Sequence, residues 1–345
     1  MVIQKSIYLV AAVFVGFLFN MLNIPAGWLI GSILTGIICG VFITRFQFHR
    51  NLFKLVLAFV GANISLLIHI DSLKLISHLF LPLLATILVL IATGYLLGLL
   101  LHKKTNIDRN TAFFCCIPGG ASEIIGISGQ YGADDRLVAA FHTIRITFFT
   151  ISIPLLIGYF HPITVEPTVQ HSITLLSPSQ ILFFLIVILI TLFLDKKLKF
   201  PGGTLIFSIV TGFLLTTLFM EIEPVPRTTS GIGQALIGAF VGIRFDREVL
   251  KSVWKVGPTT VLIISTLFCI TLGTSFIFML ITGLPYATSL ISTVPAGAAE
   301  MTVTAVALEV NPTIVASLHI IRVITLFLLL SFLLKFLKIK TSNEV

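Results

Sequence analysis

Apolar residues fill this chain in long runs, and short polar segments separate the runs. The runs at 79–101 and 259–282 exceed the ~18 apolar residues that predict a transmembrane helix. Shorter runs of the same kind cover most of the remaining sequence. The predicted spans are, in chain order, 6–22, 26–43, 52–69, 79–101, 110–131, 137–160, 180–194, 202–220, 229–243, 257–282, 285–308 and 313–334. The pattern therefore predicts an all-α polytopic integral membrane protein.

One stretch of the sequence occurs twice. Residues 117–146 align without a gap on residues 294–323, at an offset of 177, and nine of the thirty positions are identical. The identical residues include Pro, Glu, His and Arg, which chance would rarely pair in so apolar a chain. A second pair of segments, 24–36 and 200–212, repeats at an offset of 176. Because the two offsets nearly agree, we interpret the chain as an internal duplication.

The duplication divides the chain into two membrane repeats, residues 1–160 and 179–345. The segment between them, 161–178, contains no Lys or Arg, and we predict an extracytoplasmic linker there. Orientation follows from the Lys and Arg residues, which concentrate on the cytoplasmic side of membrane proteins. The sequence Pro-Gly-Gly at 118–120 recurs as Pro-Ala-Gly at 295–297. If each of these Pro-Gly elements enters and leaves the membrane on one side, 18 Lys and Arg lie inside and two lie outside. If each element crosses the membrane, 11 lie inside and nine outside. We therefore predict two inverted-topology repeats, each with about five transmembrane helices plus one broken or re-entrant helical element, and both termini in the cytoplasm.

Composition sharpens the class of protein. Hydrophobic residues make up 57% of the chain and charged residues 10%, whereas soluble domains carry ~25% charged residues. The net charge of +8 does not indicate nucleic-acid binding, because the basic residues lie in short clusters between apolar spans. The four cysteines show neither a disulfide pattern nor metal-ligand spacing. We therefore expect contact with a lipid bilayer, no nucleic acid, and no metal or other cofactor.

Pro118, Gly119 and Gly120 interrupt the first of the two matching stretches, and Pro295 and Gly297 recur at the same place in the second. Proline lacks an amide donor and glycine is flexible, so the helix breaks and frees backbone groups. Such groups are tolerated in a membrane only inside protein or against a water-filled cavity. Inverted repeats whose broken helices meet near the midplane are typical of secondary transporters. We therefore predict one central substrate or ion site.

Glu123 and Glu300 follow the two breaks, in the first turn of the next half-helix. The positive end of the helix dipole favours a carboxylate there, so each glutamate could simply cap its half-helix or pair with the arginine of its repeat. An ionisable group inside a membrane segment is, however, a functional candidate in its own right. The interpretation we favour is a proton or cation site.

A histidine and an arginine, spaced i and i+3, recur on the long helix after each break as His142 and Arg145 and as His319 and Arg322. Each pair shares one helix face. The arginines are candidates either for binding a substrate carboxylate or phosphate or for neutralising a glutamate. The histidines are candidates for proton coupling or for packing. A metal site of two His and two Glu lacks clustered ligand spacing and is disfavoured.

Three polar residues outside the repeated motif are weaker candidates. Asn63 and Ser65 lie near the end of a span, where they could line the site. Asp195 precedes Lys196 and Lys197, and we interpret it as part of the solvated end of a helix.

The repeated element supports a specific resemblance. Its first copy reads PGGASE, then GADD, then HTIR on the following helix, and this pattern resembles the membrane AbrB family over essentially the whole chain. The second copy departs from the pattern, with PAGAAE and no GAD. The resemblance implies a multi-pass protein of the bacterial inner membrane. Family members carry the labels of regulators of gene expression or ammonia monooxygenases, and the sequence shows no copper-ligand pattern for the second label.

Three classes of function follow from these observations. We favour a secondary transporter that moves a small polar or anionic solute by alternating access, coupled to protons or another cation. The alternative is a membrane regulator or sensor that changes gene expression indirectly, since no segment between spans is long enough to bind DNA. An enzyme would need a metal or nucleophile constellation that we do not find, so we expect no enzyme. The expected ligand is an unidentified small molecule or ion, with a homo-oligomer as an open alternative.

Overall fold

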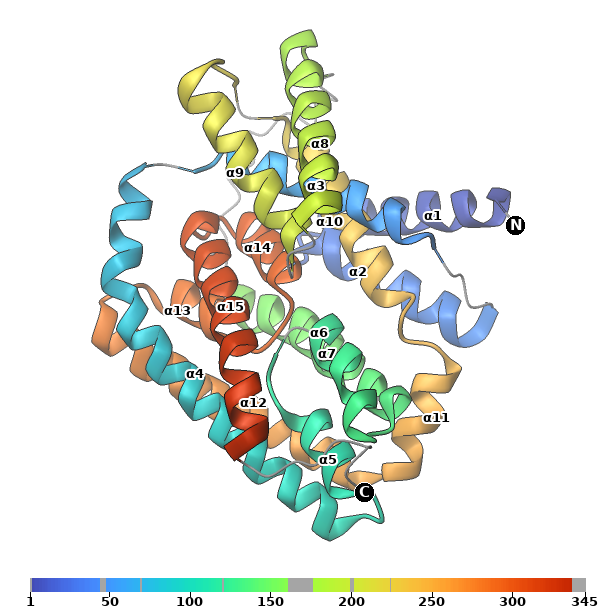
Figure 1. Ribbon diagram of the computed structural model, residues 1–345. Helices are drawn as coiled ribbons and strands as arrows, with labels where there is room; N and C mark the ends of the chain where they lie inside the picture. The colour runs from blue at the N-terminus through green and yellow to red at the C-terminus, as the bar shows by residue number, and fades with distance from the viewer. Residues whose placement is uncertain are drawn as a thin grey trace.

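The computed structural model describes residues 2–43, 48–68, 70–119, 121–160, 176–198, 202–223 and 225–336. This part of the chain is helical apart from short connections and contains no strand (Figure 1). The helices are α1 (Val2–Met21), α2 (Gly27–Ile38), α3 (Arg50–Ser65), α4 (Ile70–Lys104), α5 (Arg109–Cys116), α6 (Ala121–Ser128), α7 (Asp135–Phe160), α8 (Pro178–Leu198), α9 (Gly203–Leu218), α10 (Arg227–Gly242), α11 (Arg247–Val256), α12 (Pro258–Thr282), α13 (Tyr286–Thr293), α14 (Ala298–Ala307) and α15 (Pro312–Phe336). The predicted all-α class is confirmed.

Helices occupy the predicted spans, with two differences. The first is α4, which begins at Ile70, so the fourth span starts earlier than the apolar run at 79–101 indicated. The second is α11, which lies outside every predicted span because its sequence, REVLKSVWKV, is charged on one face and too short to cross a membrane. Asp246 caps α11 by accepting hydrogen bonds from two backbone N–H groups at 3.0 Å.

The order of helices in the first repeat recurs in the second. By their place in the chain, α1, α2 and α3 correspond to α8, α9 and α10, and α5, α6 and α7 correspond to α13, α14 and α15. The long α4 corresponds to two helices, α11 and α12, which meet at Gly257. Gly257 has a φ of 65°, a left-handed value that glycine adopts without a steric penalty, and Pro258 begins the next helix.

The helices pack into two bundles, and each bundle draws on both repeats (Figure 1). One bundle contains α1–α3 and α8–α10, and the other contains α4–α7 and α11–α15. Within the first bundle α2 lies against α10, and its counterpart α9 lies against α3. The two repeats therefore interlock rather than forming separate bodies. The linker predicted at 161–178 lies outside the described residues as far as residue 175, and α8 begins at Pro178.

Close helix approach in the first bundle depends on small residues that recur between the repeats. α2 and α10 meet at Gly36, where an added Cβ would lie 2.7 Å from the backbone of Gly242. α9 and α3 meet at the equivalent positions, Gly212 and Gly61, where a Cβ would overlap a serine side chain of the partner helix. Small residues at such positions let helix backbones approach closely within a membrane. Both copies of the sequence therefore contain the small residues that allow the two repeats to pack against each other.

The outer surface of the described helices is strongly apolar. Ile3, Val10 and Val261 expose 74%, 69% and 67% of their surface, and many large apolar side chains on the same helices are similarly exposed. Among the described residues, the helices long and apolar enough to cross a membrane are Ile3–Met21, His78–Lys104, Asp135–Phe160 and Pro258–Thr282. Soluble proteins rarely expose contiguous apolar surface on this scale, so this surface faces lipid.

Candidate functional site at two helix breaks

Each repeat contains one pair of short helices that meet end to end. In the first repeat α5 ends at Cys116 and α6 begins at Ala121. In the second repeat α13 ends at Thr293 and α14 begins at Ala298. The interruptions fall at the predicted Pro-Gly elements, although Gly120 itself lies outside the described residues. Each break leaves the last carbonyl groups of one half-helix without intrahelical donors.

His142 and Arg145, both buried in α7, bind the carbonyl groups at the first break. The guanidinium of Arg145 donates to the carbonyl oxygens of Ile117 and Gly119 at 3.1 and 3.5 Å, and to Nδ1 of His142 at 3.0 Å. Because a guanidinium can only donate, Nδ1 of His142 accepts, and its Nε2 donates to the carbonyl oxygen of Phe114 at 2.9 Å. The histidine is therefore held as the neutral tautomer with hydrogen on Nε2.

His319 and Arg322, buried in α15, make the same contacts at the second break. Arg322 donates to the carbonyl oxygens of Val294 and Ala296, the latter at 2.7 Å, and to Nδ1 of His319 at 2.8 Å. Nε2 of His319 lies 2.7 Å from the carbonyl oxygen of Ile291. All four contacts are those of the first repeat moved by 177 residues. The recurrence of His and Arg thus reflects one hydrogen-bonding arrangement built twice.

This arrangement explains why a charged side chain is buried at each break. The carbonyl end of a helix carries partial negative charge, and an arginine there supplies both a positive charge and several donors. Within the described residues, Arg145 and Arg322 donate to carbonyl groups and histidine rather than to a carboxylate. A substrate contact at either arginine stays a prediction. The Nε of Arg145 is buried without a hydrogen-bond partner.

The two histidines use both ring nitrogens in these contacts. Neither ring therefore has a free nitrogen lone pair with which to ligate a metal ion. In the part of the chain that the structure describes, no three His, Cys, Asp or Glu side chains come together as a metal site. Each histidine accepts a hydrogen bond from the arginine of its own repeat, and its part in proton coupling stays a prediction.

Glu300 lies in the first turn of α14 and is 6% exposed. Its carboxylate folds back over Gly297, where an added Cβ would lie 2.6 Å from the carboxyl carbon. Glycine at this position therefore leaves the space that the carboxylate occupies. Glu123 lies at the equivalent place in α6, and its side chain is outside the described residues. Whether the glutamates bind a proton or a cation stays a prediction.

The two breaks lie in one core. Ile117 at the first break and Val294 and Ala296 at the second belong to the same cluster of buried apolar residues. α7, which holds the first break, also packs against α13 and α14 of the second. The structure thus brings the predicted site elements of both repeats together.

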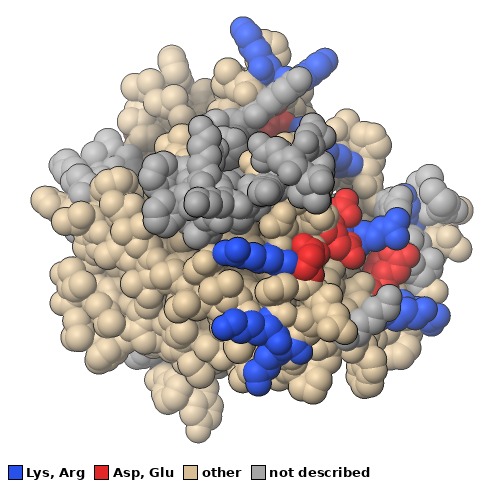
Figure 2. All heavy atoms as spheres, turned by 60° about the horizontal axis from the view of Figure 1, so that its bottom comes forward, with Lys and Arg blue, Asp and Glu red and all other residues tan. Residues whose placement is uncertain are grey.

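The helix after the first break lines a large cavity, whereas the helix after the second break is buried from Ala299 to Ala305. The cavity has a volume of about 1390 Å³ and is lined by Ala121 and Ile125 of α6, by one face of α7, and by the connection from α10 to α11. The positions of α14 equivalent to Ala121 and Ile125 are Ala298, which is partly buried, and Thr302, which is fully buried. Figure 2 shows one face of the molecule, on which acidic and basic side chains gather in part of a largely uncharged surface. The described residues of the predicted site lie beside this cavity rather than on its wall.

Sequence reasoning missed the residues that line the cavity. In the sequence, Arg244 and Lys104 are among the basic residues that indicate orientation, and Thr147 of α7 is one polar residue within an apolar span, yet all three line the cavity. None of the three recurs at the equivalent position of the other repeat, so the duplication could not single them out. One sequence signal could have found Thr147. It lies four residues after Thr143, so the two threonines share one face of the helix that carries the His-Arg pair.

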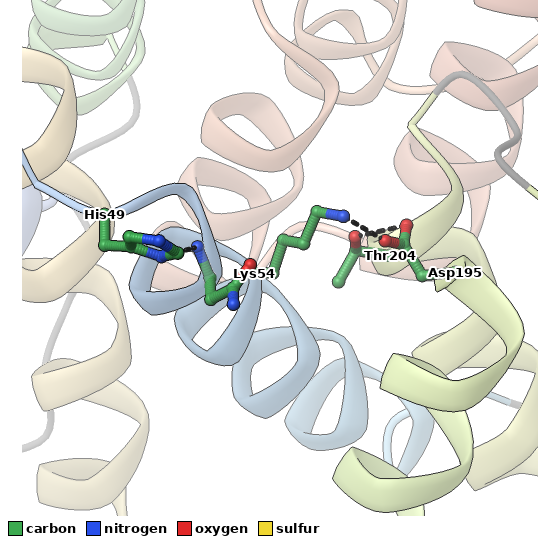
Figure 3. Close-up of polar contacts among 5 residues, drawn as sticks. His49, Lys54, Asp195 and Thr204 are labelled. Atoms are coloured by element: carbon green, nitrogen blue, oxygen red, sulfur yellow. Dashed lines mark hydrogen bonds and ion pairs between the residues drawn. The ribbon is translucent and has the colours of Figure 1, made fainter.

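Asp195 is not part of a solvated helix end, and that interpretation was wrong. The side chain is 8% exposed, forms an ion pair with Lys54 of α3, and accepts a hydrogen bond from Thr204 of α9 at 2.7 Å (Figure 3). It thereby ties three helices of the first bundle. Asn63 likewise packs within this bundle, donating to Ser230 of α10 at 2.8 Å. The hydroxyl of Ser65 donates to a carbonyl of its own helix at 2.6 Å.

Fold and site together define a polytopic all-α membrane protein whose two halves each contain a broken helix bound by a buried His-Arg pair. The family model described as "Transition state regulatory protein AbrB" matches residues 28–338. The chain belongs to this AbrB family.

Two relatives match along nearly the whole chain. The chain is 23% identical over 329 residues to the Escherichia coli (strain K12) protein named "Putative regulator AbrB", covering 95% of this chain and 94% of that protein. It is also 23% identical over 351 residues to "Uncharacterized protein YhjN" of Bacillus subtilis (strain 168), covering 91% of this chain and 88% of that protein. No solved structure matches the chain significantly.

Proposed function

We propose that this protein is a secondary transporter that moves a small polar or anionic solute by alternating access, coupled to protons or another cation. The observation that carries the proposal is that two identically built helix breaks lie in different surroundings. The helix after the first break lines a cavity at Ala121 and Ile125, whereas the helix after the second break is buried from Ala299 to Ala305. An alternating-access cycle would exchange these surroundings while each break keeps its internal contacts.

The His-Arg contacts support such a cycle. They tie each pair of half-helices to the long helix that follows, α5 and α6 to α7, and α13 and α14 to α15. Each group of three helices is therefore suited to move as one unit, because its buried carbonyl groups stay satisfied throughout. Motion would occur at the surfaces between these groups and the first bundle.

We further propose that Glu300 and Glu123 couple the cycle to a proton or cation. Glu300 is buried at a helix N-terminus in the middle of the core, and the structure gives it no ion pair among the described residues. A carboxylate in such a place is more easily accommodated when it is protonated or binds a cation. Movement between water and the packed core would therefore change its charge state.

The cavity is proposed to face the cytoplasm, with both chain termini on that side and the protein in the bacterial inner membrane. Lys104, Arg136 and Lys251 line the cavity, and basic residues near membrane helices concentrate inside. Single cysteines at Gln130 and Val310, in the connections that follow α6 and α14, test this orientation. The inverted arrangement predicts labelling of Gln130→Cys from the cytoplasm and of Val310→Cys from outside, whereas labelling from the same side would contradict it.

Transport itself is tested with the purified protein in lipid vesicles loaded with a small-molecule extract of bacterial cells. With a proton gradient imposed, mass spectrometry should show protein-dependent loss of particular solutes. The Glu300→Gln variant should abolish that loss, because coupling requires a group that changes charge. A vesicle content that never differs from protein-free vesicles would contradict the proposal.

The alternative function is a membrane regulator, which the name of the E. coli relative and the family description favour. In that case the cavity would bind a signal without passing it across the membrane. Binding without flux in the vesicle experiment would support this alternative. A membrane enzyme lacks a supporting observation within the described residues.

A further inference from the structure

We propose that the cavity beside the first break recognises a small oxyanion, a carboxylate or a phosphate, through Arg244 and the hydroxyl of Thr147. The inference rests on the proposed transport function and deepens it by naming the substrate class. It is carried by three features of the cavity wall: an excess of basic side chains, an arginine without a hydrogen-bond partner, and a buried hydroxyl without one.

The cavity wall carries more positive than negative side chains. Its charged residues are Arg50, Lys104, Arg136, Arg244 and Lys251, with Asp134, Asp246 and Glu248. Two of the three carboxylates are engaged at helix N-termini. Asp134 accepts from two backbone N–H groups of α7 at 3.1 Å, and Asp246 accepts from two of α11 at 3.0 Å. The field inside the cavity therefore favours an anion.

Arg244 presents its guanidinium to the cavity. The residue lies on the connection between α10 and α11, exposed, with the guanidinium carbon 5.0 Å from the centre of the Phe53 ring. Stacking on an aromatic ring fixes the plane of the guanidinium and leaves its donors available. Within the described residues no hydrogen bond or ion pair engages those donors. Arg247, three residues later, instead donates to the carbonyl oxygens of Val41 and Phe42.

Thr147, which lines the cavity from α7, has a hydroxyl without a partner. The residue is 4% exposed, and its Oγ1 has no hydrogen-bond partner. Thr150, on the same helix, shows the usual arrangement, in which the hydroxyl donates to the carbonyl four residues earlier, here Ile146, at 2.7 Å. A buried hydroxyl without a partner is unfavourable, so a ligand oxygen that accepts from it would be stabilised.

The remaining wall indicates an organic body on the ligand. Ile125, Ile146 and Phe240 line the cavity among the charged residues.

Thiol modification tests the charge preference without knowledge of the natural ligand. In a variant without native cysteines, single cysteines at Thr143 and Ala139 report on the cavity, and Gln130→Cys reports on a surface outside it. Each is treated with an anionic sulfonate and a cationic trimethylammonium methanethiosulfonate reagent. The anionic-to-cationic rate ratio should be on the order of tenfold higher in the cavity than at Gln130. A ratio equal to or lower than that at Gln130 at both cavity positions would overturn the proposal.

Two pairs of variants assign the recognition to the named residues. Arg244→Gln should lower the cavity rate ratio several-fold, while Arg247→Gln, which removes an equal charge outside the cavity, should leave it within about twofold.

Succinate or inorganic phosphate at constant ionic strength should slow modification of the cavity cysteines. Protection by succinate alone assigns a carboxylate substrate, protection by phosphate alone assigns a phosphate, and protection by neither contradicts the proposal.

Thr147→Val should weaken that protection on the order of tenfold without loss of stability, because Oγ1 bonds nothing in the protein. Thr150→Val is the matched control and should leave protection unchanged. Equal protection in Thr147→Val and the parent would remove Thr147 from the site. If vesicles show solute flux but the cavity prefers the cationic reagent, transport stands and the oxyanion proposal fails. Oxyanion protection without flux would retain this site and contradict transport.

Discussion

The two helix breaks have the same internal construction and different surroundings. Arg145 and Arg322 bind carbonyl groups at positions that differ by 177 residues throughout. The helix after the first break faces a cavity of about 1390 Å³, whereas Ala299 to Ala305 of α14 is buried. The comparison teaches that the repeated residues build the break itself. Residues that are not repeated, such as those of the α10–α11 connection, form the different surroundings of the two breaks.

The turns that precede the long helices α7 and α15 also combine a repeated structural role with residues that are not repeated. Asp134 and Asn311 occupy equivalent positions, and each accepts from the backbone N–H groups that begin the following long helix. Their residue types differ, yet both are preferred N-cap residues. The capping role is therefore repeated although the residue is not, and the aspartate is charged where Asn311 is neutral.

The largest expected effect comes from removing an arginine. Arg322→Ala should lower the free energy of unfolding by ~3–5 kcal/mol, because buried carbonyl groups lose their charged donors. Arg145→Ala should cost less, since water in the adjacent cavity can replace some of the lost hydrogen bonds. Denaturant unfolding in detergent micelles measures both. Arg322→Lys is the control, and it should not restore stability because an ammonium cannot bind both carbonyls and His319 together. Equal losses at the two arginines would contradict the comparison.

A smaller effect is expected at the glycine beside Glu300. Gly297→Ala should destabilise the protein by ~1–3 kcal/mol, since the methyl group would displace the buried carboxylate. Gly273→Ala is the matched control, because nothing lies within 4 Å of a Cβ added there in α12. Thermal unfolding in micelles compares the two variants. Unchanged stability in Gly297→Ala would show that the carboxylate does not need this space.

The ion pair in the first bundle should matter less. Lys54→Met leaves Asp195 with only the Thr204 hydroxyl, and we expect a loss of ~1–2 kcal/mol, reduced by the partial exposure of Lys54. Lys196→Met, which removes an exposed lysine beside Asp195, is the control and should leave unfolding within about 0.5 kcal/mol of the parent. Both breaks should keep their surroundings in Lys54→Met, so the accessibility of cysteines in α6 should not change. A change there would mean that the first bundle controls the cavity.

The smallest effect on stability, with a clear effect on function, is expected at the glutamates. Glu300→Gln preserves the shape of the side chain and removes its charge. If Glu300 couples the cycle, the exposure of the two breaks should shift roughly fivefold between pH 6 and pH 8 in the parent, and not in the variant. Glu123→Gln tests the first repeat in the same way. Full retention of the pH response in both variants would rule out the glutamates as the coupling groups.

Much of the fold could be predicted from the sequence, because membrane helices require long apolar runs and the breaks require Pro and Gly. α11 escaped because a charged ten-residue helix resembles a loop in an apolar chain. The hydrogen-bond partners of the two arginines could not be predicted from the sequence either. Arg145 reaches carbonyl groups 26 and 28 residues earlier, and a sequence pattern names side chains, not the backbone atoms that a crossing helix presents.

The cavity and the burial of Asp195 were beyond prediction for a related reason. Both depend on how helices from different repeats pack, as when Lys54 of α3 meets Asp195 of α8. Neighbouring lysines made Asp195 resemble a solvated residue, since local sequence carries no record of a partner 141 positions away. Arg244 and Thr147 occur in one repeat only, so the duplication does not mark them. They become candidates only when the structure shows that both line the same cavity.

The most direct test of the central claim is whether the two breaks exchange their exposure. Single cysteines at Ile125 and at the equivalent Thr302, in a background without native cysteines, would be labelled with a membrane-impermeant thiol reagent from each side of the membrane. Alternating access predicts labelling of Ile125→Cys from the cytoplasm, labelling of Thr302→Cys from outside, and opposite changes of the two rates when a proton gradient is imposed. If Thr302→Cys stays unlabelled under every condition while Ile125→Cys labels at a constant rate, the two breaks do not exchange surroundings and the transport account is contradicted.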